Sequence, residues 1–429
     1  MYITNIDIEN IRCFEKITIP FEHQGILYRW GVLLGNNSTG KTCLLRCIAI
    51  GLCDELSGAG LIKELKGDFL RDNTQPGIIE ITLKEYKSNN EYIIQTTITR
   101  EHDDEKISQL IKKGDRENFR KKLFVCGYGI QRSGEGTESY DKYEPISAVF
   151  TLFNYYMPSL QNPEVILLRQ HRDDRESLYN LAKTILMLDD RYNFDLTKKG
   201  LEIIGPEGRV SIHSWGDGYR SLFTWTMDFI GWQIYADNLN DFKRLKDLRG
   251  IVLIDEAELN LHPNLQRYFV KIFKEQFPKV QFIITSHSPI VAAGASDFDD
   301  SKFIALIHEG NKVTDRQYVA SDIRGKRFDQ VLMSEAFGLY TVKSPGSVSN
   351  ISRYIELKNK DRDNTENTEF NQLTDRLKKE LPSGETKEEQ VAKKAFSEAL
   401  KIILSDQKEK FVKEGIDMEM KKILKDYLE

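Results

Sequence analysis

The chain has 429 residues, of which 40% are hydrophobic and 30% are charged, and these values are ordinary for a globular protein with two or three domains. No run approaches the roughly 18 apolar residues that a membrane-spanning helix needs. The net charge of −5 excludes a general attraction of the whole molecule to nucleic acid or acidic lipid, although it is compatible with a local basic surface.

The cysteines and the start of the chain indicate a protein of the reducing cytoplasm. The sequence begins with a strand pattern and lacks the basic segment and apolar core of a secretory signal. The cysteines form no CxxC pair and have no accompanying set of histidines: Cys13, Cys43, Cys47, Cys53 and Cys126. We therefore expect reduced, mostly buried thiols, no membrane association and a cytoplasmic location.

The N-terminal region shows two pairs of predicted strands on either side of a glycine-containing loop. Apolar residues alternate with polar ones over Ile3–Phe21, which predicts a hairpin that leads into the apolar run Trp30–Leu34. Two further strand-like runs, Ile78–Tyr86 and Tyr92–Thr99, are joined by a turn sequence at 87–90. This pattern predicts a mixed α/β domain and not a plain doubly wound sheet.

The loop after Trp30–Leu34 fits the pattern G-x-x-x-x-G-K-[ST] at every position: Gly35, Asn36, Asn37, Ser38, Thr39, Gly40, Lys41 and Thr42. Glycines let consecutive backbone N–H groups surround a phosphate, and the start of the next helix, Cys43–Ile50, adds its positive dipole end. In such a loop Lys41 reaches the β- and γ-phosphates and the Thr42 hydroxyl binds Mg²⁺. A chance glycine-rich turn is the weaker interpretation, because a strand precedes the loop and a helix follows it.

The middle of the chain carries weaker signals. The charge-rich segment His102–Lys122 is predicted to be a solvated loop or helix. The apolar strand Leu123–Gly129 ends just before Gln131 and Arg132, which fits either a ligand-facing pair or a surface turn with a solvated arginine. Leucines at helical spacing in Arg172–Tyr192 predict a packing face.

A second glycine-containing turn, Ser214–Ser221, precedes the apolar run Leu222–Tyr235. A helix start with a serine and two glycines can present N–H groups to an anion. By itself this signal is weak.

Two adjacent carboxylates end an apolar strand in Ile251–Glu256. Four apolar residues in a row predict a strand that is buried on both faces, as in a parallel sheet. Carboxylates at its end would be costly without a positive partner, and nucleotide-bound Mg²⁺ supplies one for Asp255. Glu256 can then orient and deprotonate an attacking water. The alternative, a helix start that carries acids, is weaker because the phosphate loop lies in the same chain.

Another buried strand, Val280–Thr285, follows the predicted helix Pro263–Phe277, as a β-α-β unit requires. It ends in Ser-His-Ser-Pro, so His287 lies where ligands of open α/β sheets gather. A lone histidine is more often structural, and its position at the strand end favours the functional interpretation here.

Together these motifs resemble the ABC-type ATPase heads of the SMC and RecF class, which includes the overcoming-lysogenization-defect proteins. The strings DEAELNLHP and ITSHSP are typical of bacterial members. The matching segments are a Walker A loop, a Q-loop candidate, a degenerate signature, a Walker B strand, a D-loop and a switch histidine: Gly35–Thr42, Gln131, Ser214–Ser221, Ile251–Glu256, Ala257–His262 and His287.

The resemblance implies a fold, an activity and an assembly. The fold is a mixed sheet with a P-loop core plus an antiparallel β meander, and the activity is hydrolysis of ATP with Mg²⁺. Two or more copies hold ATP between the Walker A loop of one copy and signature residues of the other: Ser214, Gly216, Asp217 and Gly218. Lys41, Glu256 as general base and His287 at the γ-phosphate are the implied catalytic residues. The implied magnesium ligands are Thr42, Asp255 and Gln131.

The resemblance divides the chain into a head, residues 1–320, and a C-terminal helical domain, residues 321–429. A helical subdomain with the signature, at about 132–248, is inserted in the head, and no SMC-like heptad coiled coil interrupts it. The tail shows no strand that ends in the acidic cluster of a Toprim nuclease domain, so we expect no nuclease site. Four apolar stripes predict tail helices that begin near Val331, Ile351, Phe370 and Val391.

The tail sequence FDQVLMSEAFGL resembles defence ATPases of the Septu PtuA and retron-associated type. This resemblance implies the ATPase subunit of a bacterial anti-phage complex, which controls an effector protein, a nuclease or toxin, through ATP-dependent dimerisation. A DNA-repair ATPase of the RecF or SMC type, which binds DNA across an ATP-closed dimer, is the alternative. ATP-dependent and salt-sensitive DNA binding would favour it. The sequence ELNLHP and the predicted helical tail disfavour a transporter ATPase.

Overall fold

The computed structural model describes the following residues of the chain: 1–88, 90–102, 104–132, 142–154, 160–236, 242–334, 337, 344–360 and 362–380. The chain forms two compact units, Met1–Val342 and Lys343–Glu429. The predicted head boundary, at residue 320, lies before this division. No helix of the described part is long and apolar enough to span a membrane.

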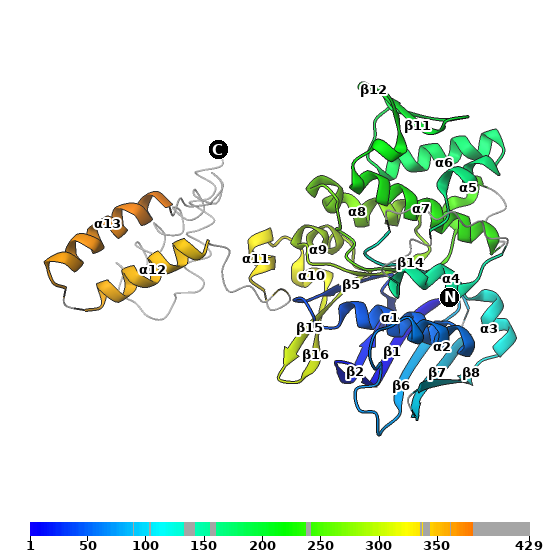
Figure 1. Ribbon diagram of the computed structural model, residues 1–429, viewed down its shortest axis with the longest axis horizontal. Helices are drawn as coiled ribbons and strands as arrows, with labels where there is room; N and C mark the ends of the chain where they lie inside the picture. Colours follow the sequence, from blue (N-terminus) through cyan, green and yellow to red (C-terminus); the bar gives the residue numbers. More distant parts are fainter. Residues whose placement is uncertain are drawn as a thin grey trace, which may run out of the picture. The chain divides into compact units, whose positions relative to one another are not determined.

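A six-stranded sheet forms the centre of the first unit, in the order β16-β15-β5-β14-β13-β9 (Figure 1). The four pairings β15-β5, β5-β14, β14-β13 and β13-β9 are parallel, whereas β16 is antiparallel to β15. The strands are β5 (Trp30–Leu34), β9 (Val125–Tyr128), β13 (Gly250–Ile254), β14 (Val280–Thr285), β15 (Ser301–Glu309) and β16 (Lys312–Val319).

Both faces of this sheet are covered, which explains why its strands lack polar alternation. On β13, Ile251 and Leu253 belong to one hydrophobic cluster, whereas Val252 and Ile254 belong to the other. Successive side chains of a strand point to opposite faces, so a strand between two apolar layers must be apolar throughout. The predicted buried strands are therefore confirmed.

The lower layer in Figure 1 is a five-stranded antiparallel sheet in the order β2-β1-β6-β7-β8, with helices α1 and α2 packed on it. The predicted hairpins are confirmed, and they join into one sheet. The segment that follows the second hairpin was predicted as a loop or helix, but it forms a strand and then a helix: β8 pairs with β7 and α3 follows. Its charges misled the prediction because one face of the edge strand is solvated.

The elements of this layer, with the short β3-β4 pair, are β1 (Tyr2–Ile11), β2 (Phe14–Pro20), β3 (Glu22–His23), β4 (Ile26–Leu27), α1 (Lys41–Leu52), α2 (Glu55–Lys63), β6 (Gly77–Lys84), β7 (Glu91–Glu101), β8 (Asp104–Lys113) and α3 (Arg116–Lys122).

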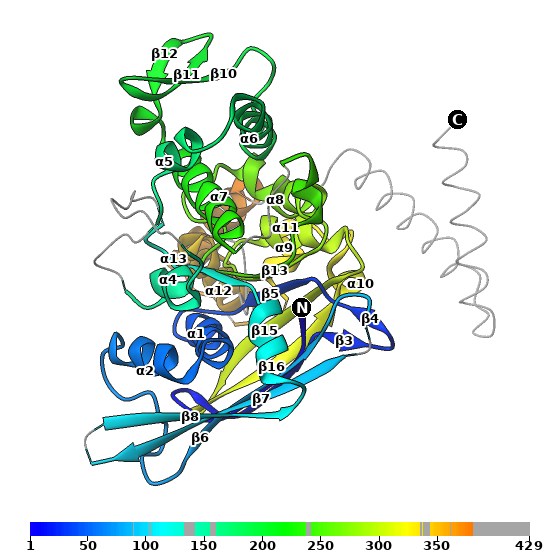
Figure 2. The ribbon, with the colours of Figure 1, turned by 90° about the vertical axis from the view of Figure 1, so that its right-hand side faces the viewer.

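The opposite face of the central sheet carries mainly helices (Figure 2). The expected helical subdomain also contains a three-stranded antiparallel sheet, β10-β11-β12, which the sequence analysis missed. The remaining elements of the first unit are α4 (Pro145–Val149), η1 (Phe150–Leu152), α5 (Pro163–Leu168), α6 (Arg172–Ile185), β10 (Asn193–Thr197), β11 (Gly200–Gly205), β12 (Gly208–Ser211), η2 (Ile212–Ser214), α7 (Asp217–Tyr235), η3 (Phe242–Asp247), α8 (Pro263–Gln276), α9 (Pro289–Ser296), α10 (Ala320–Ile323) and α11 (Phe328–Leu332).

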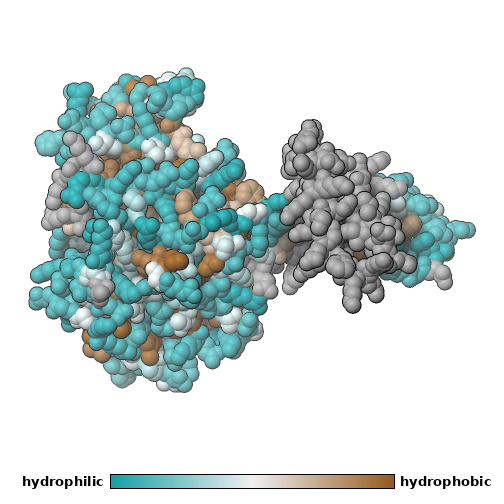
Figure 3. All heavy atoms as spheres, turned by 180° about the vertical axis from the view of Figure 1, so that it is seen from behind, coloured by the Kyte–Doolittle hydropathy of each residue, from teal (hydrophilic) through white to brown (hydrophobic). Residues whose placement is uncertain are grey.

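The face of the first unit seen in Figure 3 is mainly hydrophilic, with scattered hydrophobic spots. In the second unit, α12 (Pro345–Lys358) packs against α13 (Asn364–Glu380). The rings of Tyr354 and Phe370 stack with centroids 4.9 Å apart. Two of the predicted tail stripes thus lie on helices, and the fourth, from Val391, lies outside the described residues.

Candidate functional site

A cavity of about 480 Å³ lies at the carboxyl ends of the parallel strands β5, β13 and β14. Most of its lining consists of residues for which the sequence predicts a role at a nucleotide. The lining residues are Arg12, Cys13, Asn37, Ser38, Gly40, Lys41, Thr42, Cys43, Asp255, Glu256 and His287. The fold therefore brings the Walker A loop, the Walker B carboxylates and the switch histidine together around one space.

The shape of the Walker A loop requires its two glycines. Gly35 and Gly40 have φ angles of 139° and 89°, a region that side chains rarely adopt. A Cβ atom at Gly35 would lie 2.5 Å from the carbonyl oxygen of Leu306, and one at Gly40 would lie 2.5 Å from the Cys13 sulfur. The loop runs directly into α1, whose first N–H groups have no partner inside the helix and suit an anion.

Lys41 is buried at the base of this loop. Its ammonium donates to the carbonyl oxygens of Gly35 (2.9 Å) and Asn36 (2.8 Å). Burial lowers the pKa of Lys41, and the nearby carboxylates of Asp255 and Glu256 oppose that shift. The carbonyl oxygens of the Walker A loop thus hold the Lys41 ammonium at the cavity wall, where it is expected to contact phosphates.

Walker A and Walker B are joined by a hydrogen-bonded network around Asp255. The Thr42 hydroxyl donates to one oxygen of the Asp255 carboxylate, and the Thr285 hydroxyl donates to the other, each at 2.7 Å. Asp255 is only 3% exposed, so these bonds and the Lys41 cation offset the cost of burying its charge. Thr285, at the end of β14, was not singled out from the sequence.

Glu256 lines the cavity in an unusual backbone conformation, with a φ angle of 47°. Its N–H donates to the Thr285 hydroxyl at 2.7 Å. Its carbonyl oxygen accepts a bond of 2.5 Å from the Arg132 guanidinium. The surrounding bonds on both sides of the residue hold this left-handed turn, and with it the direction of the carboxylate.

Arg132 is not the solvated arginine that one interpretation of the sequence predicted. It is 2% exposed, and its guanidinium also donates to the carbonyl oxygens of Gly129 and Asp255. Burial lowers the pKa of Arg132 to about 10. The preceding residue, Gln131, is exposed and is absent from the described lining of the cavity. Arg132 therefore fixes the backbone of the Walker B end, while a role of Gln131 at magnesium stays a prediction.

His287 lies at the cavity wall after β14. Its backbone N–H donates to the Glu258 carboxylate at 2.5 Å. Burial, and next the charge of Lys41, lower the pKa of His287 below its usual 6.5. The ring is therefore neutral at neutral pH, so it can donate one hydrogen bond to an anion without a full positive charge.

The signature residues do not line the cavity of their own chain. Ser214, at the end of η2, and Gly216 and Asp217, at the start of α7, are exposed. Gly218 is buried, and a Cβ atom there would lie 2.1 Å from the carbonyl oxygen of Asn260. Gly218 thus permits close contact between α7 and the D-loop, whereas the other three are available to a second molecule.

A buried carboxyl also ties α7 to β9, the strand before Arg132. Asp228 accepts hydrogen bonds from the Tyr128 hydroxyl (2.9 Å) and from the backbone N–H of Gln161 (2.8 Å). Burial raises the pKa of Asp228 to about 7. The Tyr128 carbonyl oxygen accepts the Asp255 N–H at 2.8 Å, so the signature helix and the Walker B strand share one bonded neighbour.

Arg12 and Cys13 are cavity residues that the sequence analysis did not single out. They occupy the turn between β1 and β2, where Arg12 has a φ angle of 43°. The guanidinium of Arg12 lies 5.5 Å from the ring of Phe69. The sequence signal that could have identified Arg12 is a basic residue in the tight turn of the hairpin that precedes the phosphate loop.

The residues present suit a magnesium ion. The Thr42 hydroxyl and the Asp255 carboxylate are hard oxygen donors that already meet at 2.7 Å. Within the described part of the chain, no group of three His, Cys, Asp or Glu side chains could hold a metal by itself. This fits an ion that is held by one or two side chains together with phosphates and water, which is how Mg²⁺ usually binds with nucleotides.

Comparison with known proteins gives one family match. The family model described as "AAA domain, putative AbiEii toxin, Type IV TA system" matches residues 32–293. The Septu protein PtuA of Bacillus mycoides (strain KBAB4) is 24% identical over 391 residues, 91% of this chain and 52% of that protein. The retron Ec83 probable ATPase of Escherichia coli is 33% identical over 122 residues, 28% of this chain and 21% of that protein.

The chain thus spans about half the length of the Bacillus relative, and its match to the retron protein covers 21% of that protein. Among solved structures, an Smc head bound to the C-winged helix domain of ScpA covers 75% of this chain and 99% of its own, with a TM-score of 0.50 at 14% identity. That likeness concerns the fold, and it confirms the predicted class of an ATPase head with a mixed sheet.

Proposed function

Because the chain belongs to the family described as "AAA domain, putative AbiEii toxin, Type IV TA system", we propose that it binds ATP with Mg²⁺ and hydrolyses it. The observation that carries this proposal is the contact between the two nucleotide motifs. The Thr42 hydroxyl of Walker A and the Asp255 carboxylate of Walker B, which are 213 residues apart in sequence, are hydrogen-bonded at the cavity wall.

In this proposal the Walker A residues 35–42 surround the phosphates with N–H groups, and Lys41 leaves its loop carbonyls to contact the β- and γ-phosphates. Thr42 and Asp255 hold Mg²⁺, which neutralises phosphate charge when it is bound. Glu256 accepts a proton from the attacking water, and His287 donates a hydrogen bond to the γ-phosphate. The bonds from Arg132 and Thr285 keep Glu256 in place.

A second copy of the chain completes the nucleotide-binding site. The exposed positions of Ser214, Gly216 and Asp217, away from their own cavity, support their contact with a nucleotide that is bound to the partner copy. Closure then depends on a γ-phosphate that both copies contact, so ATP favours the closed state by its difference in affinity between the two states.

The chain acts in a bacterial anti-phage defence complex, where the ATP-dependent closure controls an effector protein. The similarity to a Septu protein and to a retron ATPase supports this role. The unit that contains α12 and α13 docks the effector, typically a nuclease or toxin, and we expect no nuclease site in the part of the chain that the structure describes. Purification of the chain with the proteins encoded beside it tests this part, and recovery of the chain alone would contradict it.

Replacement of Glu256 by glutamine tests the ATPase proposal. We expect phosphate release to fall by about 10²-fold or more, since general-base catalysis contributes factors of that size. ATP-bound dimers should persist, because glutamine keeps the size of the side chain and removes only the base. Phosphate assays and light scattering with ATP measure the two effects. Glu275→Gln, on α8, is the matched control; phosphate release from Glu256→Gln equal to that of the control would reject Glu256 as the base.

A further inference from the structure

A second cavity, of about 520 Å³, lies at the opposite edge of the central sheet. Its lining includes Phe124 and Gly250, at the amino ends of β9 and β13, whereas the ATP cavity lies at the carboxyl ends of the parallel strands. The two cavities share no lining residue. A ligand here would therefore contact a different set of residues from a nucleotide between Walker A and Walker B.

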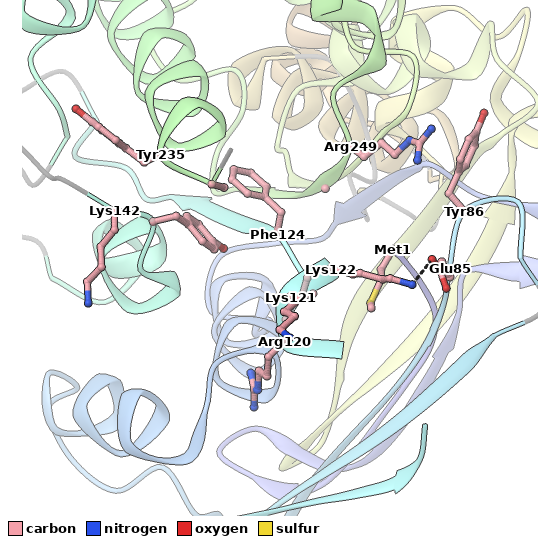
Figure 4. A pocket seen from close by; sticks show the side chains of 14 residues that line it. Met1, Glu85, Tyr86, Arg120, Lys121, Lys122, Phe124, Lys142, Tyr235 and Arg249 are labelled. Atoms are coloured by element: carbon pink, nitrogen blue, oxygen red, sulfur yellow. Dashed lines mark hydrogen bonds and ion pairs between the residues drawn. The ribbon is translucent and has the colours of Figure 1, made fainter. Parts of the chain in front are cut away.

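The lining of this second cavity is basic. Of the fourteen residues that line it, five are cationic and one is acidic: Arg120, Lys121, Lys122, Lys142, Arg249 and Glu85. In Figure 4 Lys142 lies on one side and Arg249 on the other, with Lys121 and Lys122 between them. This concentration of positive charge contrasts with the net charge of −5 of the whole chain.

Two of the five cations already have partners in the fold. The guanidinium of Arg120 donates to the carbonyl oxygens of Leu52 (2.8 Å) and Cys53 (3.2 Å). The Lys122 ammonium pairs with the Glu85 carboxylate at 2.7 Å. The single acid of the lining is therefore engaged by Lys122, and Figure 4 also marks its contact with Met1, so no lining carboxylate is left for the other cations.

The other three cations are not neutralised by the described residues that line the cavity. Lys121 is exposed and has no hydrogen-bond or ion-pair partner among them. Lys142 pairs with Glu144 at 3.2 Å, but their side chains are 79% and 43% exposed, so the pair is weak. The Arg249 guanidinium lies 4.2 Å from the centre of the Tyr86 ring, which orients the group and leaves its charge and donors in place.

Helix stability explains only part of this arrangement. Arg120, Lys121 and Lys122 form the last turn of α3, where cations interact favourably with the helix dipole. Lys142 and Arg249 come from other segments of the chain, so the dipole of α3 does not account for them. Their convergence on one cavity indicates an anionic ligand.

We propose that this second cavity binds phosphate groups, either of a free nucleotide or of a nucleic acid strand, through Lys121, Lys142 and Arg249. Arginine presents a planar fork of donors and lysine a compact charge, and both are common phosphate ligands. The volume suffices for a nucleotide, because it exceeds the 480 Å³ of the cavity that we assign to ATP.

The test uses the full chain with the three substitutions Lys121→Gln, Lys142→Gln and Arg249→Gln. All the proteins compared also carry Lys41→Ala, so that binding at Walker A does not mask the result. The probes are a fluorescent single-stranded oligonucleotide and fluorescent ADP, each measured by anisotropy. The matched control replaces three lysines outside the cavity, on β2, β8 and α6: Lys16→Gln, Lys106→Gln and Lys183→Gln. Thermal unfolding checks that both triple variants are folded.

For a single strand, each phosphate contact makes the slope of log K against log salt more negative by about 0.7. At about 0.1 M salt, the loss of one such contact therefore weakens binding by about fivefold. The cavity variant should therefore bind the oligonucleotide on the order of a hundredfold more weakly, with a salt slope reduced by about 2. Binding of the oligonucleotide alone identifies a strand as the source, and displacement by ADP identifies a free nucleotide. Binding of neither probe, or equal binding by the cavity variant and the control variant, would overturn the proposal.

Discussion

Replacement of Asp228 by asparagine should remove a pH dependence of stability that the buried carboxyl imposes. Asp228 lies on α7 with an exposed fraction of 1%, and burial raises its pKa from 3.8 to about 7. In the unfolded chain the carboxyl ionises above pH 3.8, but in the folded protein it keeps its proton until about pH 7. The folded state therefore loses stability relative to the unfolded state as the pH rises through this window.

The size of the effect follows from the two pKa values. Each pH unit between them costs about 1.4 kcal/mol of unfolding free energy. The total from 3.8 to about 7 is then about 4 kcal/mol, and about 3 kcal/mol of it falls between about pH 5 and pH 7. Below the lower value both states are protonated and above the upper value both are ionised, so the contribution is constant outside the window. Asparagine is neutral throughout.

Urea unfolding of the wild type and of Asp228→Asn at several pH values measures the difference. The buried Trp225 and Trp232 lie on the same helix, so their fluorescence reports the relevant transition. Other titrating groups cancel when the two proteins are compared. We expect wild-type stability to fall relative to the variant as the pH rises from 5 to 7, by about 3 kcal/mol. A difference that stays constant within about 1 kcal/mol would mean that Asp228 is already ionised at the lower pH, and would refute the reasoning.

Three further substitutions test the supports of the site. Thr285→Val removes the hydroxyl that accepts a hydrogen bond from the Glu256 N–H, so it should destabilise the fold by about 1–3 kcal/mol and lower ATP turnover. Thr285→Ser keeps the hydroxyl and should keep both stability and turnover. Chemical denaturation measures the stability, and phosphate release measures the turnover. Arg132→Met leaves buried carbonyl oxygens without their hydrogen-bond donor, so it should lower the unfolding free energy by about 3 kcal/mol or more and abolish ATP turnover. Chemical denaturation measures the stability, and an unchanged stability would contradict the buried contacts of Arg132. Gly218→Ala should lower the melting temperature because its Cβ would overlap a carbonyl oxygen, whereas Gly216→Ala, where no atom lies within 4 Å, should not; equal melting temperatures would reject the packing role.

The sequence predicts the parts of the site that local pattern determines. Residues 35–42 fit the phosphate-loop pattern at every position, and the apolar run that ends in two carboxylates identifies a strand end. Parallel order then places these segments at one edge of the sheet, which the bond between Thr42 and Asp255 bears out. The binding roles that we assign to these residues stay predictions.

The parts that the sequence did not reveal depend on contacts between distant segments. Arg132 follows a glycine-rich strand end, a composition that also suits a solvated turn, and only the fold places its guanidinium under the carbonyl oxygen of Glu256. Gly218 looks like a signature glycine, but the nearby carbonyl oxygen of Asn260 accounts for its missing side chain. Charge was misleading in β8, where an edge strand has a solvated face.

The central claim is that two copies of the chain enclose one nucleotide between the Walker A loop of one and the signature turn of the other. Mixing two inactive variants tests it most directly. Lys41→Ala disables Walker A, and Gly216→Arg blocks the signature at an exposed position with no atom within 4 Å of its Cβ. Each variant alone should hydrolyse no ATP. The mixture should recover about a quarter of wild-type turnover, since half of the symmetric dimers are mixed and each of those has one complete site of two. No recovery in mixtures that form dimers, or full activity of Gly216→Arg alone, would contradict the claim.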